Sequence, residues 1–356
     1  MKIDIITLHC PANCGSVLQG FALCRYLSDE FGKGNVQLID YVPDYMETEG
    51  RGIRTLLRKT LYRKPYRSRQ EKFAKFINEN CVLTEKKYKT YKELEQDVPE
   101  ADVYVTGSDQ LWNPCFPCGN DLAYFLKFVK DKPKVAYSTS LGNDKLNKEE
   151  LESIAEKIQD YSFISVREKC SCEQLENVGV QDVHWACDPT LLLKREDYDK
   201  LAVDFKKIGK YVAVYLVEHS QLLDDLLDDF RSKGYKIVGV GGYLKKYKCD
   251  IHIMDAGPAE FLGLIRDASF VVATSFHATV FSLIFQKEFA IIPPEMNPAR
   301  IEQLLEYVGL KERIITDISQ KKALSNSIAY DEVQRKLDVF RTESQQMLLE
   351  TIKRWE

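Results

Sequence analysis

Short apolar segments alternate with amphipathic segments along most of the chain, and this alternation constrains the fold more than any other feature. Segments rich in β-branched and aromatic residues predict strands at 3–8, 36–41, 102–106, 134–139, 163–166, 211–217, 235–240, 270–274 and 289–292. Amphipathic patterns between them predict helices at 17–31, 148–161, 222–233 and 258–268. Strand–helix alternation of this kind builds doubly wound parallel sheets, so the sequence predicts an α/β protein.

The alternation runs twice, with a charged stretch at 188–210 between the two runs. A chain of 356 residues also exceeds the size at which a single hydrophobic core normally stops growing. We therefore expect two Rossmann-like domains, at 1–190 and 191–330, with a basic insertion at 46–80 in the first. A final helical pattern at 331–356 is long enough to pack back on the first domain.

The composition is that of an ordinary globular protein, with 44% hydrophobic and 29% charged residues and a net charge of −4. No apolar run is long enough to span a bilayer, and the first residues form a strand pattern interrupted by Asp4 rather than a signal peptide. We therefore expect a cytoplasmic protein, in which the ten cysteines are buried or incidental thiols. No metal site is expected, because the pair Cys115 and Cys118 lacks the second pair of a zinc site.

The segment 51–76 differs from the rest of the chain in charge, because it carries ten Lys or Arg residues and a single acid, Glu71. Four aliphatic residues share one face of a helical pattern in it: Ile53, Leu56, Leu57 and Leu61. Such a pattern is typical of a helix on an anionic membrane surface, which would place the protein at the inner face of the membrane. The alternative is a helix that packs on the domain through its leucines and exposes its basic face to solvent. Nucleic acid is not expected as a partner, since the whole chain is acidic and has no nucleic-acid motif.

Small and polar residues follow the first and third predicted strands. Asn13, Gly15 and Ser16 precede the helix at 17–31, where they form either an anion cradle or a plain helix cap. The run 106–113 combines a glycine, several hydrogen-bonding side chains and Trp112, which suggests contact with a sugar; a capped helix start is the alternative. Because the carboxyl ends of parallel strands form the usual ligand crevice, both turns are candidate sites.

In the second half, the strand at 270–274 turns directly into a helix, with Thr274, Ser275 and His277 at the junction. The free N–H groups and positive dipole end of such a helix favour an anion above the strand tip. The alternative is a histidine that is bonded only to the local backbone.

The residues of these turns resemble the polysaccharide pyruvyl transferase family. The matching segments are Asn13-x-Gly15-Ser16-x-x-Gln19-Gly20 and the runs 106–113, 138–142, 165–168, 188–191 and 274–285. The resemblance implies a two-domain fold like that of the GT-B glycosyltransferases. It also implies transfer of pyruvate from phosphoenolpyruvate to two hydroxyls of a sugar as a cyclic ketal, in exopolysaccharide, capsule or cell-surface glycan biosynthesis.

The resemblance further implies roles for individual residues. Catalysis is assigned to Arg167 and His277, which hold the donor and move a proton, and to Asp109, which orients or deprotonates a sugar hydroxyl. The donor-binding set is Thr274, Ser275, Ala278, Thr279 and Arg300. The acceptor-binding set is Asn13, Gly15, Ser16, Gln19, Gly107, Ser108, Gln110, Trp112 and Ser140. Many family members carry Arg at the position of Ser275, so either a cation elsewhere, Arg300 or Arg266, replaces it, or the donor differs.

Phosphoenolpyruvate is the expected co-substrate, and no cofactor is expected. The sequence does not decide whether the acceptor sugar is lipid-linked or nucleotide-linked. Two other functions fit the same sequence: a nucleotide-sugar-dependent glycosyltransferase of GT-B fold, and a sugar-binding protein without catalytic activity.

Overall fold

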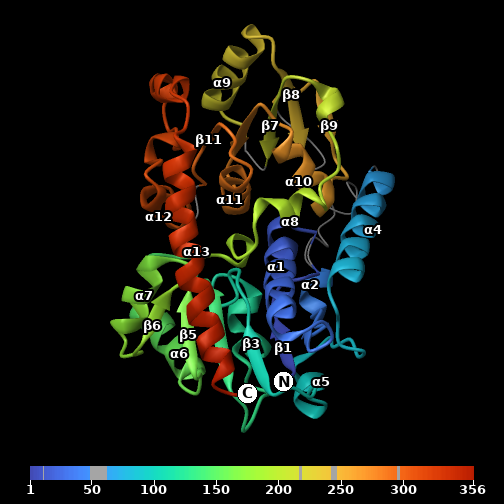
Figure 1. Cartoon of the computed structure of the whole chain (residues 1–356), viewed down its shortest axis with the longest axis vertical. Coiled ribbons are helices and arrows are strands. Elements are labelled where there is room, and N and C mark those ends of the chain that lie inside the picture. The colour runs from blue at the N-terminus through green and yellow to red at the C-terminus, as the bar shows by residue number, and fades with distance from the viewer. Residues whose placement is uncertain (11, 49–61, 216–218, 242–246, 295–296) are drawn as a thin grey trace. The chain divides into compact units, whose positions relative to one another are not determined.

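The computed structural model describes residues 1–10, 12–48, 62–215, 219–241, 247–294 and 297–356. The chain divides into two compact units (Figure 1). The first unit comprises Met1–Glu49, Ile77–Leu192 and Asp338–Glu356, and the second comprises Gly50–Phe76 and Leu193–Leu337.

The first unit is built on a parallel sheet of six strands in the order β2-β1-β3-β4-β5-β6. The strands are β1 (Ile3–Ile6), β2 (Val36–Leu38), β3 (Val103–Thr106), β4 (Lys134–Thr139), β5 (Phe163–Val166) and β6 (Val183–Trp185). Its helices are α1 (Cys14–Phe31), α2 (Asp44–Thr48), α5 (Tyr91–Gln96), α6 (Lys148–Ile158) and α7 (Lys169–Glu176), with short 3₁₀ turns η1 (Pro117–Asn120), η2 (Leu122–Phe125) and η3 (Pro189–Leu191). The chain order reverses at β1, which pairs with β2 on one side and β3 on the other.

The second unit is built on a parallel sheet of five strands in the order β11-β10-β7-β8-β9. The strands are β7 (Tyr211–Tyr215), β8 (Lys236–Val240), β9 (Ile251–Ile253), β10 (Phe270–Ala273) and β11 (Phe289–Ile291). Its helices are α8 (Arg195–Asp199), α9 (Gln221–Ser232), α10 (Pro258–Arg266), α11 (Phe276–Ile284) and α12 (Ala299–Val308), with turns η4 (Lys206–Ile208), η5 (Lys311–Arg313) and η6 (Ile318–Ser325). Here the order reverses between β7 and β10.

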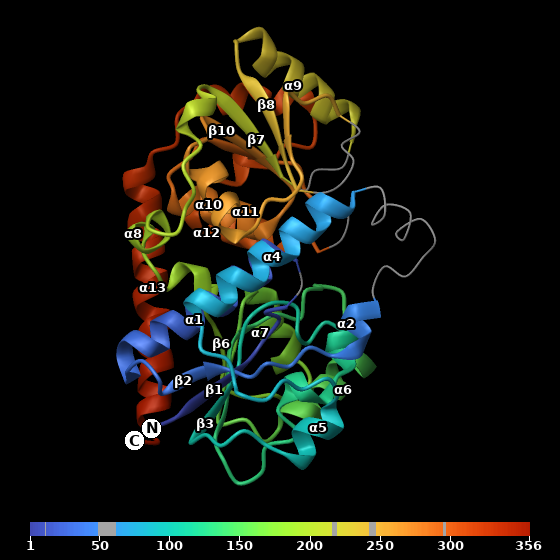
Figure 2. The ribbon, with the colours of Figure 1, turned by 90° about the vertical axis from the view of Figure 1, so that its right-hand side faces the viewer.

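Helices cover both faces of each sheet, as right-handed crossovers require. In the second unit α9 lies on one face, and α10 and α11 lie on the other (Figure 2). The central strands are therefore buried on both sides, which explains their nearly continuous apolar sequences. Val212 and Val214 of β7 and Val272 of β10 are fully buried, for example. The predicted fold class, two doubly wound sheets of GT-B-like type, is confirmed.

The basic segment continues into α4 (Arg63–Asn80), whose residues up to Phe76 group with the second unit rather than with the expected first domain. Polar contacts explain this grouping, since Ser68 Oγ and Lys72 Nζ donate to Asp255 Oδ2 over 2.6 and 2.9 Å. Lys72 also pairs with Glu260 at 2.9 Å. The aliphatic face expected between 53 and 61 lies outside the described residues.

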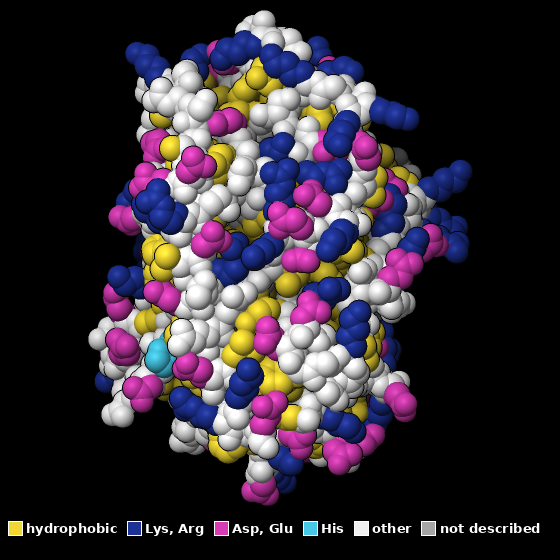
Figure 3. Space-filling model, in the orientation of Figure 1, with side chains coloured by type: hydrophobic (Ala, Val, Ile, Leu, Met, Phe, Trp, Pro, Cys, Tyr) yellow, Lys and Arg dark blue, Asp and Glu magenta, His cyan; other side chains and the backbone are white. Residues whose placement is uncertain are grey.

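The long last helix, α13 (Tyr330–Lys353), belongs to the second unit up to Leu337 and to the first unit from Asp338 onward. Its later part packs on the first unit as predicted, because Ser344 Oγ accepts from the Cys187 amide at 2.9 Å. The Phe340 ring also lies 4.4 Å from that of Trp185. Among the described residues, no helix has both the length and the apolar character needed to cross a membrane. Figure 3 shows acidic and basic side chains interleaved over the face that it draws.

Candidate functional site

The first candidate site lies at the carboxyl ends of β1 and β3, the strands between which the order of the first sheet reverses. Ligands of open α/β sheets bind at such a reversal. There Ser16 Oγ, in the first turn of α1, donates to Asp109 Oδ2 over 2.5 Å. Asp109 follows β3 and has a φ of 79°, a left-handed conformation that is uncommon outside glycine. This bond therefore joins the two segments that border the reversal.

Local hydrogen bonds explain why α1 begins here. The exposed Asn13 accepts from the Gly15 amide at 2.9 Å and caps the helix, which starts at Cys14, before the expected position 17. The buried Gln19 donates from Nε2 to Thr7 Oγ1 and to the Ser16 carbonyl, both at 2.8 Å. Gln19 thus ties the start of α1 to the end of β1, which is a positioning role.

The residues 107–110, which follow β3, are mostly buried, whereas residues that bind a sugar acceptor must be accessible to it. A Cβ on Gly107 would lie 3.0 Å from Thr7 Cβ, so glycine permits the close approach of β1 and β3 at this point. Ser108 is fully buried, and its Oγ donates to Asp188 Oδ2 at 3.4 Å. Gln110 is half-buried, and its Oε1 accepts from Asn113 Nδ2 at 2.9 Å.

Trp112 is a core residue rather than the expected sugar platform. It is fully buried, and its indole N–H donates to the Tyr124 carbonyl at 3.2 Å. Its ring stacks on Phe125 at 5.8 Å and meets the edge of Tyr161 at 5.7 Å. A ring enclosed by these neighbours offers no face to a ligand, which corrects the interpretation of this residue.

Arg167, directly after β5, is held between two carboxylates. Its Nε pairs with Glu168 and its Nη1 with Asp188, each at 3.1 Å. Ser140 Oγ donates to the same Glu168 oxygen, Oε1, over 2.7 Å. Burial acts to lower the pKa of the Arg167 guanidinium, but Glu168 and Asp188 outweigh it and raise the pKa. The guanidinium therefore stays charged and organises the two carboxylates, of which Asp188 also accepts a hydrogen bond from Ser108.

One pair of candidate residues at this edge was not predicted from the sequence. His9 follows β1 and is 5% exposed, and its Nε2 lies 3.1 Å from Asp40 Oδ1 beyond β2. Its Nδ1 lies 3.3 Å from the Thr7 carbonyl oxygen. Both ring nitrogens thus lie within reach of an oxygen atom that can accept a hydrogen bond. The spacing of 31 residues between His9 and Asp40 conceals this pairing in the sequence.

The second candidate site lies where β10 meets α11, at the reversal of the second sheet. The N-cap residue Ser275 makes no side-chain capping bond to the helix. The Thr274 hydroxyl oxygen is buried and has no hydrogen-bond partner among the described residues. His277, in the first helical turn, is 7% exposed, with its ring 5.3 Å from Phe276. Hydroxyls, backbone N–H groups and an imidazole therefore converge at this helix start.

The remaining donor residues take different places in the second unit. Ala278 and Thr279 are fully buried in α11, and Thr279 Oγ1 donates to the Ser275 carbonyl at 3.0 Å. Arg300 is half-buried in the first turn of α12. Arg266 ends α10, at the opposite end of β10 from Thr274. It bonds to Asp267 at 2.9 Å and to backbone carbonyls of 199, 202 and 203, so it does not replace the arginine missing at Ser275.

The structure thus gathers two sets of candidate residues, each within its own unit. Ser16, Asp109 and the Arg167 cluster belong to the first unit, whereas Thr274, Ser275 and His277 belong to the second. Within residues 1–10, 12–48, 62–215, 219–241, 247–294 and 297–356, no group of three His, Cys, Asp or Glu side chains could hold a metal ion.

Comparisons with known proteins bear on the fold and on the family of the chain. No curated protein matches the chain. The fold is similar to that of UDP-GlcNAc 2-epimerase from Methanocaldococcus jannaschii, in complex with UDP-GlcNAc and UDP, with a TM-score of 0.53, 14% identity and 99% of each chain covered. It is also similar to the UDP-GlcNAc-bound epimerase from Neisseria meningitidis, with a TM-score of 0.52, 11% identity, and 99% of this chain and 100% of that chain covered. At these identities the likeness shows the fold alone.

A family model, in contrast, matches residues 13–295, which include every candidate residue named above from Asn13 to Thr279. Among the predicted site residues, Arg300 alone falls beyond its end. The chain belongs to the polysaccharide pyruvyl transferase family.

Proposed function

We propose that this protein transfers pyruvate from phosphoenolpyruvate to two hydroxyls of a sugar, forming a cyclic ketal in exopolysaccharide, capsule or cell-surface glycan biosynthesis. The observation that carries the proposal is the family match over residues 13–295, which spans both sets of candidate residues. The chemistry of each set supports it separately.

The start of α11 suits the donor. Phosphoenolpyruvate carries a carboxylate and a phosphate, and the first N–H groups of a helix lack intrahelical partners and lie at its positive end. The buried Thr274 hydroxyl has no hydrogen-bond partner among the described residues, so it can donate to an anion here. His277 in the same turn provides an imidazole, a group that can donate or accept a proton.

The reaction requires an addition and then a displacement at carbon 2 of the donor. The first sugar hydroxyl attacks carbon 2, loses its proton to a base, and carbon 3 gains a proton and becomes a methyl group. The second hydroxyl then displaces phosphate from carbon 2, and its proton leaves with the phosphate. General acid–base catalysis of such a step is typically worth about 10²- to 10⁴-fold in rate. We assign the proton on carbon 3 to His277.

Asp109 is the proposed base for the sugar hydroxyl. Its Oδ2 already accepts a hydrogen bond from one hydroxyl, that of Ser16, at 2.5 Å, so the carboxylate is oriented toward O–H donors. The left-handed backbone at Asp109 favours a functional reading, because such strain concentrates at active sites. Ser16 and the Gln110 amide bond to Asp109, and together with Asn13 at the start of α1 they remain the proposed acceptor contacts.

Arg167 takes a positioning role in this proposal. Its Nε and Nη1 atoms are committed to Glu168 and Asp188, which together carry more negative charge than the guanidinium neutralises. Donor binding through these two atoms would require an anion to displace a carboxylate. The Thr274 hydroxyl at the start of α11 has no hydrogen-bond partner among the described residues, so the donor charge is assigned to this helix start.

Thermal-shift measurements test the donor assignment first. Phosphoenolpyruvate is expected to raise the melting temperature, and UDP-GlcNAc and UDP are not. His277→Ala should abolish the shift, whereas His219→Ala, which changes an exposed histidine of the same unit, should retain it. Stabilisation by UDP-GlcNAc alone would contradict the proposal and favour a nucleotide-sugar-dependent enzyme.

Phosphate release with phosphoenolpyruvate and a panel of sugars tests turnover. Release that depends on both a sugar and His277, together with a ketal-linked product in the mass spectrum, is the expected result. Binding of phosphoenolpyruvate without release for any sugar of the panel would favour a sugar-binding protein without catalytic activity.

A further inference from the structure

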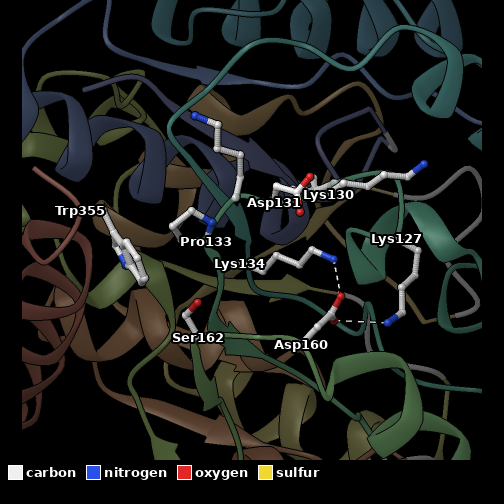
Figure 4. A pocket seen from close by; sticks show the side chains of 10 residues that line it. Lys127, Lys130, Asp131, Pro133, Lys134, Asp160, Ser162 and Trp355 are labelled. Atoms are coloured by element: carbon white, nitrogen blue, oxygen red, sulfur yellow. Dashed lines mark hydrogen bonds and ion pairs between the residues drawn. The ribbon is translucent and has the colours of Figure 1, made fainter.

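A pocket of the first unit, at the amino end of β4, has its central charges already paired. It has a volume of about 690 Å³, and Figure 4 shows the side chains of Lys127, Lys134 and Asp160 in it. Both lysines bond the carboxylate, over 3.3 and 2.6 Å. These charges neutralise one another, so the pocket gives no indication of a ligand. Two cysteines of the same unit differ from it, because their thiols can react with each other.

Cys24 and Cys81 are far apart in the sequence but adjacent in the first unit. Cys24 lies in the middle of α1 and is 2% exposed. Cys81 directly follows α4 and is half-buried, and its amide donates to the Ile77 carbonyl at 2.8 Å. The Val82 carbonyl then accepts from the Leu38 amide at 2.8 Å, so the chain after α4 runs along β2, the strand that α1 also contacts. The end of α4 and the middle of α1 therefore meet at these two residues.

The Cys24 sulfur is surrounded by hydrogen-bond donors. It accepts from the Cys81 thiol, from the Val82 amide and from the Ser28 hydroxyl. The bond from Cys81 is the largest of the effects that lower the pKa of the Cys24 thiol, whereas burial acts to raise it. The same bond, together with burial, raises the pKa of the Cys81 thiol well above its usual value. Cys24 is therefore the sulfur with thiolate character, and Cys81 keeps its proton.

We propose that Cys24 and Cys81 form a reversible disulfide when the protein is exposed to a hydroperoxide. The hydrogen bond between the two thiols already places their sulfurs side by side. A thiolate is the form of cysteine that attacks a peroxide, and a neighbouring thiol converts the resulting sulfenic acid into a disulfide. Hydrogen peroxide is the expected oxidant, because it is small enough to reach the buried Cys24 past the half-buried Cys81.

Both steps balance with hydrogen peroxide as the oxidant. The Cys24 sulfur attacks one oxygen of the peroxide, the O–O bond breaks, and the thiol proton leaves in a molecule of water, which makes Cys24 a sulfenic acid. The Cys81 sulfur then attacks the Cys24 sulfur, the S–O bond breaks, and the Cys81 proton leaves in a second water. The two thiols are thus oxidised by two electrons and the peroxide is reduced to water. Dithiothreitol reverses the reaction by thiol–disulfide exchange.

The disulfide would close a ring of chain that holds β2, α2 and α4. It would fasten the end of α4, the helix that begins in the second unit and ends in the first, to α1. Such a long ring restricts the unfolded chain, which is the main way in which a disulfide stabilises a protein. The inference is independent of pyruvyl transfer, and its test uses neither donor nor acceptor.

Peptide mapping of the full-length protein tests the pairing. The protein is treated with a small molar excess of hydrogen peroxide, remaining thiols are blocked with N-ethylmaleimide in denaturant, and the digest is analysed with and without dithiothreitol. We expect a linked Cys24–Cys81 peptide that is lighter by two hydrogen atoms than its two reduced parts and disappears on reduction. Unlinked Cys24 and Cys81 peptides, or a disulfide from either residue to another cysteine, would overturn the proposal.

Cysteine variants test the role of each sulfur. In Cys81→Ser the linked peptide should be absent, and Cys24 should accumulate as a sulfenic acid that dimedone labels. In Cys24→Ser, Cys81 should stay reduced, because a thiol that keeps its proton is a poor nucleophile. Cys172→Ser changes another buried cysteine of this unit, with a pKa raised by burial to about 12, and should leave the linked peptide unchanged. Dimedone labelling of Cys81 rather than Cys24 would contradict the assigned roles.

The donors around Cys24 and the fastening of α4 are tested separately. Ser28→Ala removes one donor and should slow disulfide formation about threefold or more, because the thiolate fraction falls. Oxidation should raise the melting temperature of the parent protein by about 4 °C or more, and dithiothreitol should reverse the rise. Peroxide should give no such rise in Cys81→Ser. A linked peptide without a higher melting temperature would contradict the fastening of α4 to α1.

Discussion

Ser16 Oγ donates to Asp109 Oδ2 over 2.5 Å, joining the first turn of α1 to the residue that follows β3. The bond holds a carboxylate at the reversal of the first sheet, and the other oxygen, Oδ1, accepts from the Gln110 amide at 2.8 Å. Because each oxygen of the carboxylate accepts a hydrogen bond, the orientation of the Asp109 side chain is fixed.

Replacement of Asp109 by Asn is expected to lower kcat for pyruvyl transfer by about 10²-fold or more, because the amide cannot accept the hydroxyl proton. Asn is the appropriate change, since it tolerates the left-handed φ of 79° better than Ala does. Phosphate release measures the effect, and the melting temperature should change little. Ser16→Ala should cost much less in kcat, and a D109N variant with near-normal turnover would remove Asp109 from the chemistry.

Replacement of Arg167 by Gln should destabilise the protein by about 3–5 kcal/mol, because it leaves the buried Glu168 and Asp188 without their cation. Urea unfolding measures this cost. Arg167→Lys keeps a charge but cannot bond both carboxylates in the same fork geometry, so an intermediate loss is expected. If Arg167 positions carboxylates rather than the donor, the Kd for phosphoenolpyruvate in R167K stays near that of the parent. A large rise in this Kd would restore donor anchoring as its role.

Gly142 is predicted to tolerate no side chain. Its φ is +67°, and a Cβ would lie 2.2 Å from Gln110 Oε1 and 2.6 Å from Asn113 Nδ2. Gly142→Ala should therefore cost about 1–2 kcal/mol for the left-handed backbone and about 1–3 kcal/mol more for the clash. The matched control is Gly179→Ala, with φ +89° and no atom within 4 Å, which should show the backbone cost alone. Equal losses in unfolding free energy would contradict the clash.

Burial raises the pKa of Asp4, on β1, to about 6. Because the folded value lies above that of the unfolded chain, its contribution to stability is present at low pH and is lost as pH rises through about 6. Asp4→Asn keeps the acceptor for Gln37 Nε2 and removes the charge. It should therefore stabilise the protein by up to about 3 kcal/mol at pH 8 and about half as much at pH 5. Denaturant unfolding at both pH values measures this, and a gain that does not depend on pH would contradict it.

The regular elements were largely predictable, because their signals are local. Strands such as Phe270–Ala273 are short, apolar and β-branched, and helices such as Lys148–Ile158 begin with a capping Asn and acidic residues. The helices α2, α5, α7, α8 and α12 were not predicted. Two strands, β6 (Val183–Trp185) and β9 (Ile251–Ile253), were also missed. Each has three residues, includes a histidine and is at least partly exposed. Neither therefore shows the run of apolar residues that indicates a buried strand.

The chemistry of the sites was less predictable, because it depends on long-range partners. Asn13, Ser16 and Asp109 could be singled out by their place at strand ends. The engagement of Arg167 by Asp188 depends on two strands that pair only in the folded sheet. The burial of Trp112 likewise depends on the turn that carries Tyr124 and Phe125, which packs over the indole. A pattern in the sequence identifies the residue type but not the neighbour that decides its role.

The course of the chain between its units limits how this protein can be dissected. Neither unit is a continuous stretch of sequence, since the first closes only with the residues from Asp338 onward. A gene fragment ending at Leu192 would lack the side chains of Arg341, Ser344 and Gln345, which bond backbone groups of Leu191, Cys187 and Leu192. An autonomous version of the amino-terminal half would therefore have to carry the end of α13, fused or supplied as a separate peptide. Chimeras that exchange the first unit with that of a relative must transplant that helical tail together with the sheet it covers.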